Sequence, residues 1–338
     1  MMKFLTTNLA AAVLTIPSLF AQGPLAPPAA PGPLMKSLDQ IEPRIPISSL
    51  PFAIHSPGSY YFTQNLQFTA TSGSAITINA SNVTLDLGGF TLSSIPAVTG
   101  RAIDSGAGHS LTVKNGYIVG NTTVVVSGTA PNQMWTVTPA GFEIGIADFS
   151  SASHYHNLGI RGCRTFGLLA TGGGNTVIDK VSVSTNGQYG ISSEFSSISN
   201  CVATANGTIG IYAFSGGVTT TTASSNGNAG IYAFSGSITN STATSNGHYG
   251  IFANSGSVTN STAKTNANTG IFAEGGSVTH STATQNGVNG IFASSGSVTN
   301  STARSNLGTD LVATTAVVAF CKAGSMTVSG ALTGNLTP

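Results

Sequence analysis

A 20-residue repeat constrains the fold of this chain more than any other feature. Between residues 190 and 309 the chain repeats the consensus G-I-[YF]-A-x-x-G-S-V-T-N-S-T-A-x-x-N-G-x-x. The unit is rich in β-branched and aromatic residues, and no stretch of about ten residues has the apolar spacing of a helix. Helical repeats are therefore excluded, and a propeller blade needs about 40 residues. The unit fits one coil of a β-solenoid, which buries its apolar side only when coils stack.

Stacking of such coils places residues 20 apart in columns, about 4.8 Å from one coil to the next. Asparagine tolerates the left-handed backbone of a sharp turn, and its side-chain amide can bond to the same amide in the next coil. The glycines are expected at corners with positive φ. The glycine column is Gly190, Gly210, Gly230, Gly250, Gly270 and Gly290, and the two asparagine columns are Asn200, Asn240, Asn260, Asn300 and Asn206, Asn226, Asn246, Asn266, Asn286, Asn306.

Alternation along the strands assigns side chains to the inside or the outside of each coil. With Ile251 and Ala253 inside, Phe252 points outward, and Val258, Ser261 and Ala263 point inward. A large exposed apolar surface marks an interaction site, so the outward aromatic column is a candidate sugar-stacking or partner-docking surface. The alternatives are the opposite register, with the aromatic rings inside, and an exposed ladder that only stabilises neighbouring coils. The column consists of Tyr212, Tyr232, Phe252, Phe272 and Phe292.

The repeat also carries a family resemblance. The pattern G-I-x-A…V-x-N-[SC]-x-A-x-x-N resembles the right-handed parallel β-helix repeats of the pectate-lyase-like superfamily, in its exported bacterial type. The segments SAITINASNVTLDLGGFTL (74–92) and GRAIDSGAGHSLTVKNGYIVG (100–120) resemble opening coils of such proteins. The resemblance implies an all-β, right-handed parallel β-helix of about 11–12 coils. It implies no single function, because this fold supports polysaccharide lyases, glycoside hydrolases, adhesins and uncharacterised exported proteins.

The chain organisation follows from these patterns. Residues 1–21 read as a signal peptide, with a basic start and an apolar middle, so we expect a secreted or extracytoplasmic protein, in the periplasm or at the cell surface. No later segment is long and apolar enough to span a membrane. A Pro-rich linker is expected at 22–35, an N-terminal cap segment at 36–69, the β-helix at 70–310 with its regular coils at 190–309, and a C-terminal cap at 311–338.

Charge and cysteine content narrow the function classes. Only 6% of the residues are charged and the formal net charge is +1. A protein that neutralises nucleic-acid phosphates needs a basic surface, so we expect no nucleic-acid partner. The chain has 3 cysteines, an odd number that does not make a disulfide framework. Cys163 and Cys201 are about two coils apart, which is too far for a disulfide bond between them.

Charged residues gather between residues 86 and 194, where any chemistry is expected. The resemblance implies two possibilities, a calcium-assisted lyase with an Arg or Lys base, and a hydrolase with paired carboxylates. Calcium needs several carboxylate oxygens, and hydrolase carboxylates lie about 5–9.5 Å apart. Asp148 with Asp179, or Glu143 with Asp148, are the plausible pairs; lone surface charges on turns are the alternative. The candidate catalytic residues are Asp104, Asp148, Arg161, Arg164 and Asp179.

Two further features are candidates for ligand contact. His154 and His156 place two imidazoles on one face of a strand, as a transition-metal site requires, but no third ligand is apparent, and no metal is predicted. Residues 121–140 break the coil rhythm and contain Trp135, a candidate binding residue. This segment is expected to form a loop or hairpin that either walls a binding cleft or covers strand edges.

The sequence therefore favours an exported β-helix protein that binds an extracellular glycan or a surface partner without catalysis and without a cofactor. The near-identity of the regular coils supports this interpretation, because a catalytic site needs distinct residues at unique positions. The alternatives are a polysaccharide lyase or glycoside hydrolase with a site in the irregular coils 100–194, for which calcium is possible only in the lyase, and a purely structural repeat array.

Overall fold

The structure, a computed structural model, describes residues 43–106, 110–130 and 132–334. The predicted signal peptide and Pro-rich linker, and residues 36–42 of the predicted cap, lie outside the described residues. Contacts divide the chain after Pro43, and the unit that begins at Arg44 is described below. Within the described residues every regular element is a β-strand, so no helix there could span a membrane.

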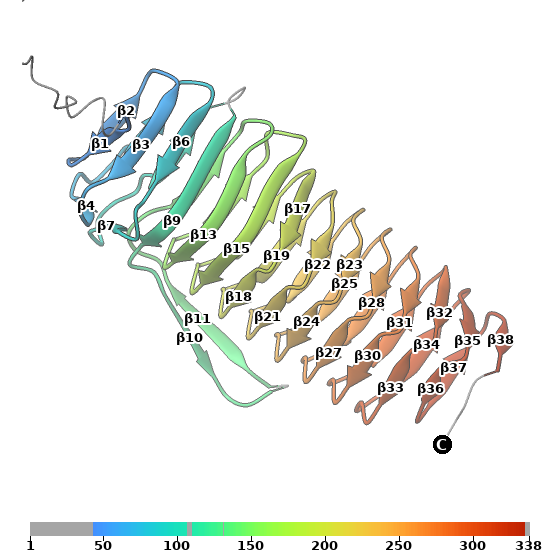
Figure 1. Ribbon diagram of the computed structural model, residues 1–338. Coiled ribbons are helices and arrows are strands. Elements are labelled where there is room, and N and C mark those ends of the chain that lie inside the picture. The colour runs from blue at the N-terminus through green and yellow to red at the C-terminus, as the bar shows by residue number, and fades with distance from the viewer. Residues whose placement is uncertain (1–42, 107–109, 131, 335–338) are drawn as a thin grey trace, which may run out of the picture. The chain divides into compact units, whose positions relative to one another are not determined.

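The described residues wind into a right-handed parallel β-helix in which each coil contributes one strand to a 13-stranded sheet (Figure 1). Neighbouring strands in this sheet are parallel, as the repeat predicts. The sheet has 13 strands, one from each coil, which is more than the 11–12 coils expected from the sequence. The strands are β2 (Phe52–Ile54), β5 (Ile76–Ile78), β8 (Ile103–Ser105), β12 (Ile144–Asp148), β14 (Phe166–Ala170), β16 (Tyr189–Ser193), β19 (Ile209–Ala213), β22 (Ile231–Ala233), β25 (Ile251–Ala253), β28 (Ile271–Ala273), β31 (Ile291–Ala293), β34 (Leu311–Ala313) and β37 (Met326–Val328).

The rest of each coil belongs to a 23-stranded sheet, to which most coils contribute two strands separated by a turn. Three strands, β9 (Leu111–Val119), β13 (His154–Arg161) and β15 (Thr176–Ser184), instead run through that turn without a break. The members are β1 (Ile45–Ile47), β3 (Gly58–Phe62), β4 (Leu66–Phe68), β6 (Val83–Asp86), β7 (Thr91–Ser94), β9 (Leu111–Val119), β13 (His154–Arg161), β15 (Thr176–Ser184), β17 (Ser196–Ser199), β18 (Val202–Thr204), β20 (Val218–Thr219), β21 (Thr222–Ser224), β23 (Ile238–Thr239), β24 (Thr242–Thr244), β26 (Val258–Thr259), β27 (Thr262–Lys264), β29 (Val278–Thr279), β30 (Thr282–Thr284), β32 (Ser297–Thr299), β33 (Thr302–Arg304), β35 (Val317–Ala319), β36 (Lys322–Ala323) and β38 (Leu332–Thr333).

The coil boundaries differ from the expected ones at both ends. The segment 36–69 was expected to form a cap, yet its strands β1 to β4 already belong to the two sheets, and Phe52 pairs with Ile76. At the other end, β34 and β37 continue the 13-stranded sheet through the segment expected as the C-terminal cap. The apolar residues of both segments therefore belong to coils of the β-helix rather than to separate caps. Residues 335–338 lie outside the described residues.

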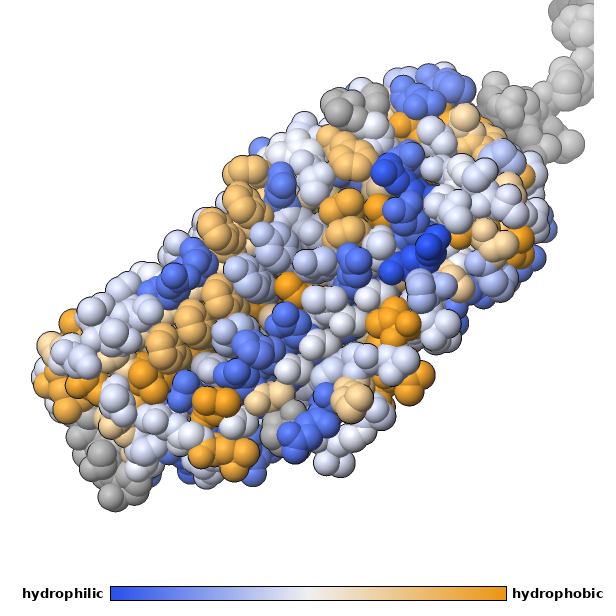
Figure 2. All heavy atoms as spheres, turned by 180° about the vertical axis from the view of Figure 1, so that it is seen from behind, coloured by the Kyte–Doolittle hydropathy of each residue, from blue (hydrophilic) through white to orange (hydrophobic). Residues whose placement is uncertain are grey.

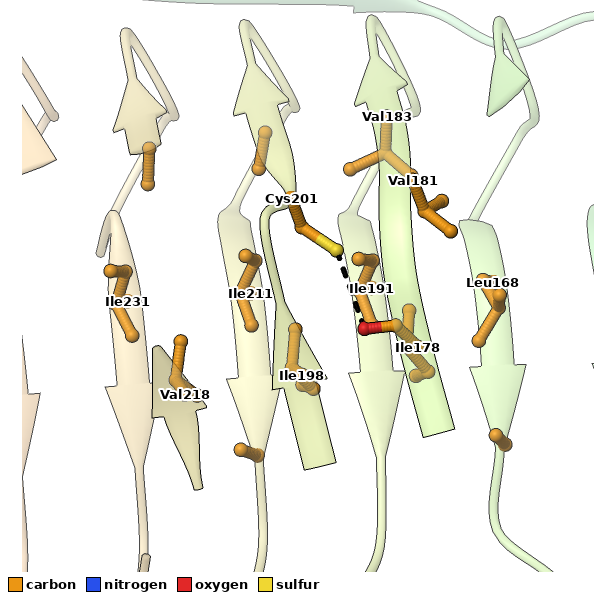
Figure 3. Close-up of a cluster of buried hydrophobic side chains, with 14 of the residues drawn as sticks. Leu168, Ile178, Val181, Val183, Ile191, Ile198, Cys201, Ile211, Val218 and Ile231 are labelled. Atoms are coloured by element: carbon orange, nitrogen blue, oxygen red, sulfur yellow. Dashed lines mark hydrogen bonds between the residues drawn. The ribbon is translucent and has the colours of Figure 1, made fainter. Parts of the chain in front are cut away.

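The register confirms the predicted columns. Ile231 pairs with Ile251, and Ile251 pairs with Ile271, each one coil apart. Ile251, Ala253, Val258, Ser261 and Ala263 are buried as predicted. Figure 3 shows the same arrangement in the middle coils, where isoleucine, valine and leucine side chains from the two sheets meet inside the coil. Cys163 and Cys201 are buried free thiols, which confirms that they are not bonded to each other.

A ladder of buried asparagine side chains runs through the regular coils. The Asn226 Nδ2 donates to Asn246 Oδ1 at 3.0 Å, and the backbone N–H of Asn226 donates to the same oxygen at 3.0 Å. Asn246 repeats both bonds to Asn266. The ladder satisfies amide groups that would otherwise be buried without partners, which is expensive in a protein interior. The ladder comprises Asn186, Asn206, Asn226, Asn246, Asn266, Asn286 and Asn306.

The two asparagine columns have different physical roles. Asn200, Asn240, Asn260 and Asn300 lie at an exposed turn with φ between 49° and 54°. This column supplies the left-handed backbone, whereas the ladder column supplies the buried amide bonds. Thr220 and His280 adopt the same backbone at the two positions where the turn column lacks asparagine.

The prediction for the repeat glycines was wrong. Gly190, Gly210, Gly230, Gly250, Gly270 and Gly290 are absent from the residues with positive φ. A Cβ at Gly250 would lie 2.5 Å from Asn266 Nδ2 and 2.6 Å from the Gly270 carbonyl oxygen. Glycine is required there because the backbone passes against the asparagine ladder, not because of a turn.

Replacement of Asn246 by alanine is expected to lower the free energy of unfolding by about 1–3 kcal/mol, because the change leaves buried donors and acceptors on both neighbouring coils unpaired. Urea unfolding followed by circular dichroism measures this loss. Asn228→Ala is the control, since Asn228 is an exposed turn residue, and it should cost less than about 0.5 kcal/mol. Equal losses in the two variants would refute a stabilising role of the ladder.

Candidate functional site

Asp148, the acidic residue common to both predicted carboxylate pairs, lies inside the coil. Its exposed fraction is 0%, and it pairs with Ser105 and Ala170 in the inward column of the 13-stranded sheet. Its oxygens accept hydrogen bonds from the Ser150 backbone N–H at 3.0 Å and from the hydroxyls of Ser150 and Tyr155. The pKa of Tyr155 is raised well above its usual value, first by burial, then by the adjacent Asp148 charge and by the hydrogen bond from Tyr155 to Asp148. The carboxylate is a buried structural group that a polysaccharide cannot reach.

The other candidate acids do not join Asp148. Asp104 pairs with Ala147 rather than with Asp148, points outward, and forms an ion pair with Arg101 at 2.6 Å. Asp179 lies on the outer side of β15 in the other sheet. The expected alignment of Asp104, Asp148 and Asp179 across coils is therefore wrong, and so is the pairing of Asp148 with Asp179 or Glu143. The reason is that the inward and outward columns alternate, so that neighbours in sequence face opposite sides.

The two candidate arginines lie in different clefts. Arg164 and Glu143 line the same cleft of about 370 Å³, together with Thr165 and Gln188. Arg161 is exposed at the end of β13 and lines two other clefts. Asp179 pairs with His156, five residues before Arg161 along β13, whereas Arg161 pairs with Ser184. The five predicted catalytic residues therefore do not form a single site.

A column of ionisable side chains crosses the outer face of the 23-stranded sheet. Asp86 pairs with Lys114, Lys114 with His156, and His156 with Asp179. Lys114 Nζ lies 3.8 Å from Asp86 Oδ2. Asp179 Oδ1 accepts hydrogen bonds from Asn200 and from Ser199, each at 2.7 Å, and these bonds lower the pKa of its carboxyl group. The register of the parallel strands assembles this column of acid–base residues from four different coils.

The two predicted imidazoles do lie together at this column. The His154 and His156 ring centroids are 4.8 Å apart. Burial lowers the pKa of His156, and the neighbouring His154 and Lys114 charges lower it further, whereas Asp179 and Asp86 raise it. The described residues contain no group of three or more His, Cys, Asp or Glu side chains that could hold a metal ion.

The aromatic column of the regular coils faces outward on the 13-stranded sheet. Tyr212, Tyr232, Phe252, Phe272 and Phe292 are half-buried and pair in register, and we call them the aromatic stripe. The Phe252 and Phe272 ring centroids are 4.9 Å apart with an interplanar angle of 5°. Most rings therefore cover one another's faces and turn their edges to solvent. Figure 2 shows a run of apolar side chains along the axis of these coils.

Residues before the stripe extend it beyond the column that the sequence predicts. The Tyr189 ring lies edge-on to the Tyr212 ring, with their centroids 6.1 Å apart. The Phe166 ring stacks on the Tyr189 ring, with their centroids 5.1 Å apart. Tyr249 lies beside the stripe, 5.2 Å from Phe252. The aromatic surface thus runs from β14 to β31, about 29 Å at 4.8 Å per coil. The irregular spacing of Phe166 and Tyr189 relative to the 20-residue repeat hid this extension.

Trp135 belongs to an antiparallel hairpin formed by β10 (Thr123–Ser127) and β11 (Met134–Thr138). The hairpin extends beside the coil turns (Figure 1). The Trp135 indole N–H donates to the Ser225 carbonyl at 2.7 Å, and its ring reaches Gly247. Val137 lies over Gly187 and Gly207. The half-buried Trp135 and Val137 together thus attach the hairpin to four successive coils, a contact that the sequence did not predict.

Sequence reasoning missed Tyr117, which lies on the outer face of β9. It is 54% exposed, and it pairs with Gly159 of β13. A Cβ on Gly159 would lie 2.7 Å from Tyr117 Cδ1, so the ring lies over this glycine. Clefts on either side share Tyr117, Gly159 and Ser182 in their walls. The only signal was a lone tyrosine in an irregular coil, which carries no periodicity.

Comparison with known proteins confirms the fold. No family model matches the chain, and no curated protein matches its sequence. Among solved structures, a periplasmic alginate epimerase aligns with a TM-score of 0.54 and 10% identity over 84% of this chain and 76% of that one. The A-module of an Azotobacter vinelandii mannuronan C-5 epimerase aligns with a TM-score of 0.52 and 14% identity over 82% and 86%. The catalytic domain of a GH87 α-1,3-glucanase in complex with nigerose gives 0.53 and 12% over 81% and 60%. The chain is therefore similar to parallel β-helix proteins.

Acidification is expected to destabilise the protein in part through His156. Its pKa is lowered in the folded state, so the unfolded state binds protons first as the pH falls below about 6.5. The contribution of neutral His156 is present above that pH and is lost as the pH falls through the folded pKa. His156→Asn should therefore show a smaller drop in Tm than the wild type between about pH 7.5 and about pH 5.

The control for this change is His280→Asn, which alters an exposed histidine on a regular coil. Calorimetric melting of the wild type and both variants at the two pH values provides the measurement. The same Tm drop in His156→Asn as in the wild type would contradict the prediction.

Proposed function

We propose that this chain binds a polysaccharide on the outer surface of its coils without cleaving it. The observation that carries the proposal is the aromatic stripe, an uninterrupted row of half-buried rings on one face of the 13-stranded sheet. An apolar row of this length fits an extended polymer that lies along the coil axis. The hydroxyls of Tyr212, Tyr232 and Tyr249 add polar groups to it, and aromatic residues with a polar end are enriched where one side is apolar and the other is wet.

Two further observations support this function. Asp148, the residue common to both predicted carboxylate pairs, is buried, so the described surface offers no carboxylate pair built around it. The similar β-helix structures include proteins that their names connect with alginate, mannuronan and α-1,3-glucan, which supports a glycan ligand by analogy of fold. The expected signal peptide at residues 1–21, and the periplasmic location named for one of these proteins, support an extracytoplasmic location.

A second candidate function is acid–base chemistry on a glycan, favoured by the column Asp86, Lys114, His156 and Asp179. Incubation of the protein with alginate and α-1,3-glucan, followed by chromatography and NMR of the products, tests it. Cleavage or epimerisation that disappears in Lys114→Gln and His156→Asn would establish an enzyme. An unchanged polymer would leave binding as the function.

The double change Phe252→Ala and Phe272→Ala is expected to weaken polysaccharide binding at least tenfold, equivalent to about 1.4 kcal/mol. It removes two adjacent rings and breaks the stripe into two shorter pieces. Affinity electrophoresis against a panel that includes alginate and α-1,3-glucan measures the effect. The matched control is Thr259→Ala with Thr279→Ala, which alters the same coils on the opposite sheet.

Melting temperatures of both double variants establish that the coils remain folded. Binding that survives the loss of both rings would remove the stripe as the binding surface. The absence of wild-type affinity for any polysaccharide of the panel would overturn the proposed function itself.

A further inference from the structure

The exposed ring of Tyr117 presents a flat face, unlike the rings of the aromatic stripe. In the stripe each ring is covered by an aromatic neighbour one coil away. The neighbour of Tyr117 is Gly159, which has no side chain, and the tyrosine ring lies down over it. Ser182 follows one coil further on. The Cδ1 and Cε1 atoms of the ring lie nearest the glycine, and more than half of the tyrosine remains exposed to a ligand.

A groove surrounds this ring on the outer surface of β9, β13 and β15. Three adjoining clefts of about 400, 300 and 430 Å³ share residues from one to the next. Tyr117, Gly159 and Ser182 link the first two clefts, and Val119 and Arg161 link the second and third. The third cleft is also lined by Thr122, Thr123 and Val124 at the base of the hairpin. The base of the hairpin therefore lines this end of the groove. Figure 1 shows the hairpin leaving the coils just after the end of β9.

The chemistry of the groove matches a sugar more closely than an apolar ligand. Apart from Tyr117, its walls are mainly glycine, asparagine, serine and threonine, with a few aliphatic side chains. The Asn157 Nδ2 donates to Asn115 Oδ1 at 3.2 Å, which orients two amides beside the ring. A ligand with one apolar face and a rim of hydroxyls satisfies both the ring and these polar groups.

Arg161 gives the groove a positive charge. It is the single charged side chain among the residues that line the three clefts. It is exposed, and it makes no ion pair within the part of the chain that the structure describes. A guanidinium presents a planar pair of donors that matches a carboxylate or sulfate.

We propose that the Tyr117 groove is a binding subsite for an acidic sugar unit, whose ring stacks on Tyr117 and whose anionic group pairs with Arg161. The inference rests on the proposed glycan-binding function, but it assigns the specificity to a surface separate from the aromatic stripe. The stripe lies on the 13-stranded sheet, whereas β9, β13 and β15 belong to the 23-stranded sheet. The stripe contributes apolar contact, and the groove selects the charge of the sugar.

The test uses the full chain and two matched probes, alginate and the same polymer after reduction of its carboxylates to alcohols. Isothermal titration calorimetry at low and high salt gives the affinity for each probe. The wild type is expected to bind alginate at least tenfold more tightly than the reduced polymer, with a preference that decreases as salt screens the charge. Arg161→Gln should abolish this preference while it retains affinity for the reduced polymer.

Two variants separate the ring from the charge. Tyr117→Ala should weaken binding of both polymers about tenfold. Gly159→Ala should weaken both as well, because the new Cβ would lie 2.7 Å from Tyr117 Cδ1 and would lift a flexible side chain rather than the backbone. Arg304→Gln, an exposed arginine on a regular coil, and Phe320→Ala, an exposed aromatic near the last coil, are the matched controls and should bind like the wild type.

The outcomes distinguish this inference from the proposed function. Equal wild-type affinity for the two polymers, or a preference that survives Arg161→Gln, would overturn the acidic subsite. Binding that is lost in the Phe252 and Phe272 double variant but unchanged in Tyr117→Ala and Gly159→Ala would overturn the groove and leave the stripe. Wild-type protein that binds neither these probes nor any other polysaccharide of the panel would overturn both proposals.

Discussion

Coil-to-coil hydrogen bonding of the buried asparagine ladder is the constraint on which the regular part of the structure depends. The ladder begins where the Asn186 Oδ1 accepts from the Cys163 backbone N–H at 3.0 Å. It ends where the Asp310 Oδ1 accepts from the Asn306 backbone N–H at 3.0 Å and from its Nδ2 at 2.7 Å. Every buried amide in between has a partner, so a one-residue slip would leave buried polar groups unpaired. The ladder therefore fixes which side chains face outward on every regular coil.

Residues governed by this period could be predicted from the sequence, because each one has copies that must share its environment. The inward positions of Ile251 and Ala253 and the outward position of Phe252 follow from alternation alone. The purpose of a repeated glycine did not follow. A positive φ and close packing both require glycine, so the sequence alone does not distinguish these two reasons. The structure does, because a Cβ at Gly250 would lie 2.5 Å from Asn266 Nδ2.

The candidate site could not be predicted in the same way, because it lies in coils without copies. Asp148 was expected at a catalytic surface, yet the register of β12 with β8 turns it inward, beside Tyr155. Lys114 and His156 are far apart in sequence and meet because β9 and β13 pair across the hairpin insertion. The length of that insertion prevents prediction of the register between β9 and β13 from the sequence. The pairing of Tyr117 with Gly159 could not be predicted for the same reason.

The same contrast explains why an exposed aromatic ring has a different use in each part of the molecule. In a perfect repeat every ring has an identical neighbour about 4.8 Å away, and parallel stacking then hides the ring faces. A free face requires a position where the period fails. Gly159 supplies such a position beside Tyr117, and the hairpin, which Trp135 attaches to the regular coils, walls the groove next to it. Regular coils thus give length and rigidity, whereas the interruption of the repeat creates a surface that can recognise one sugar unit.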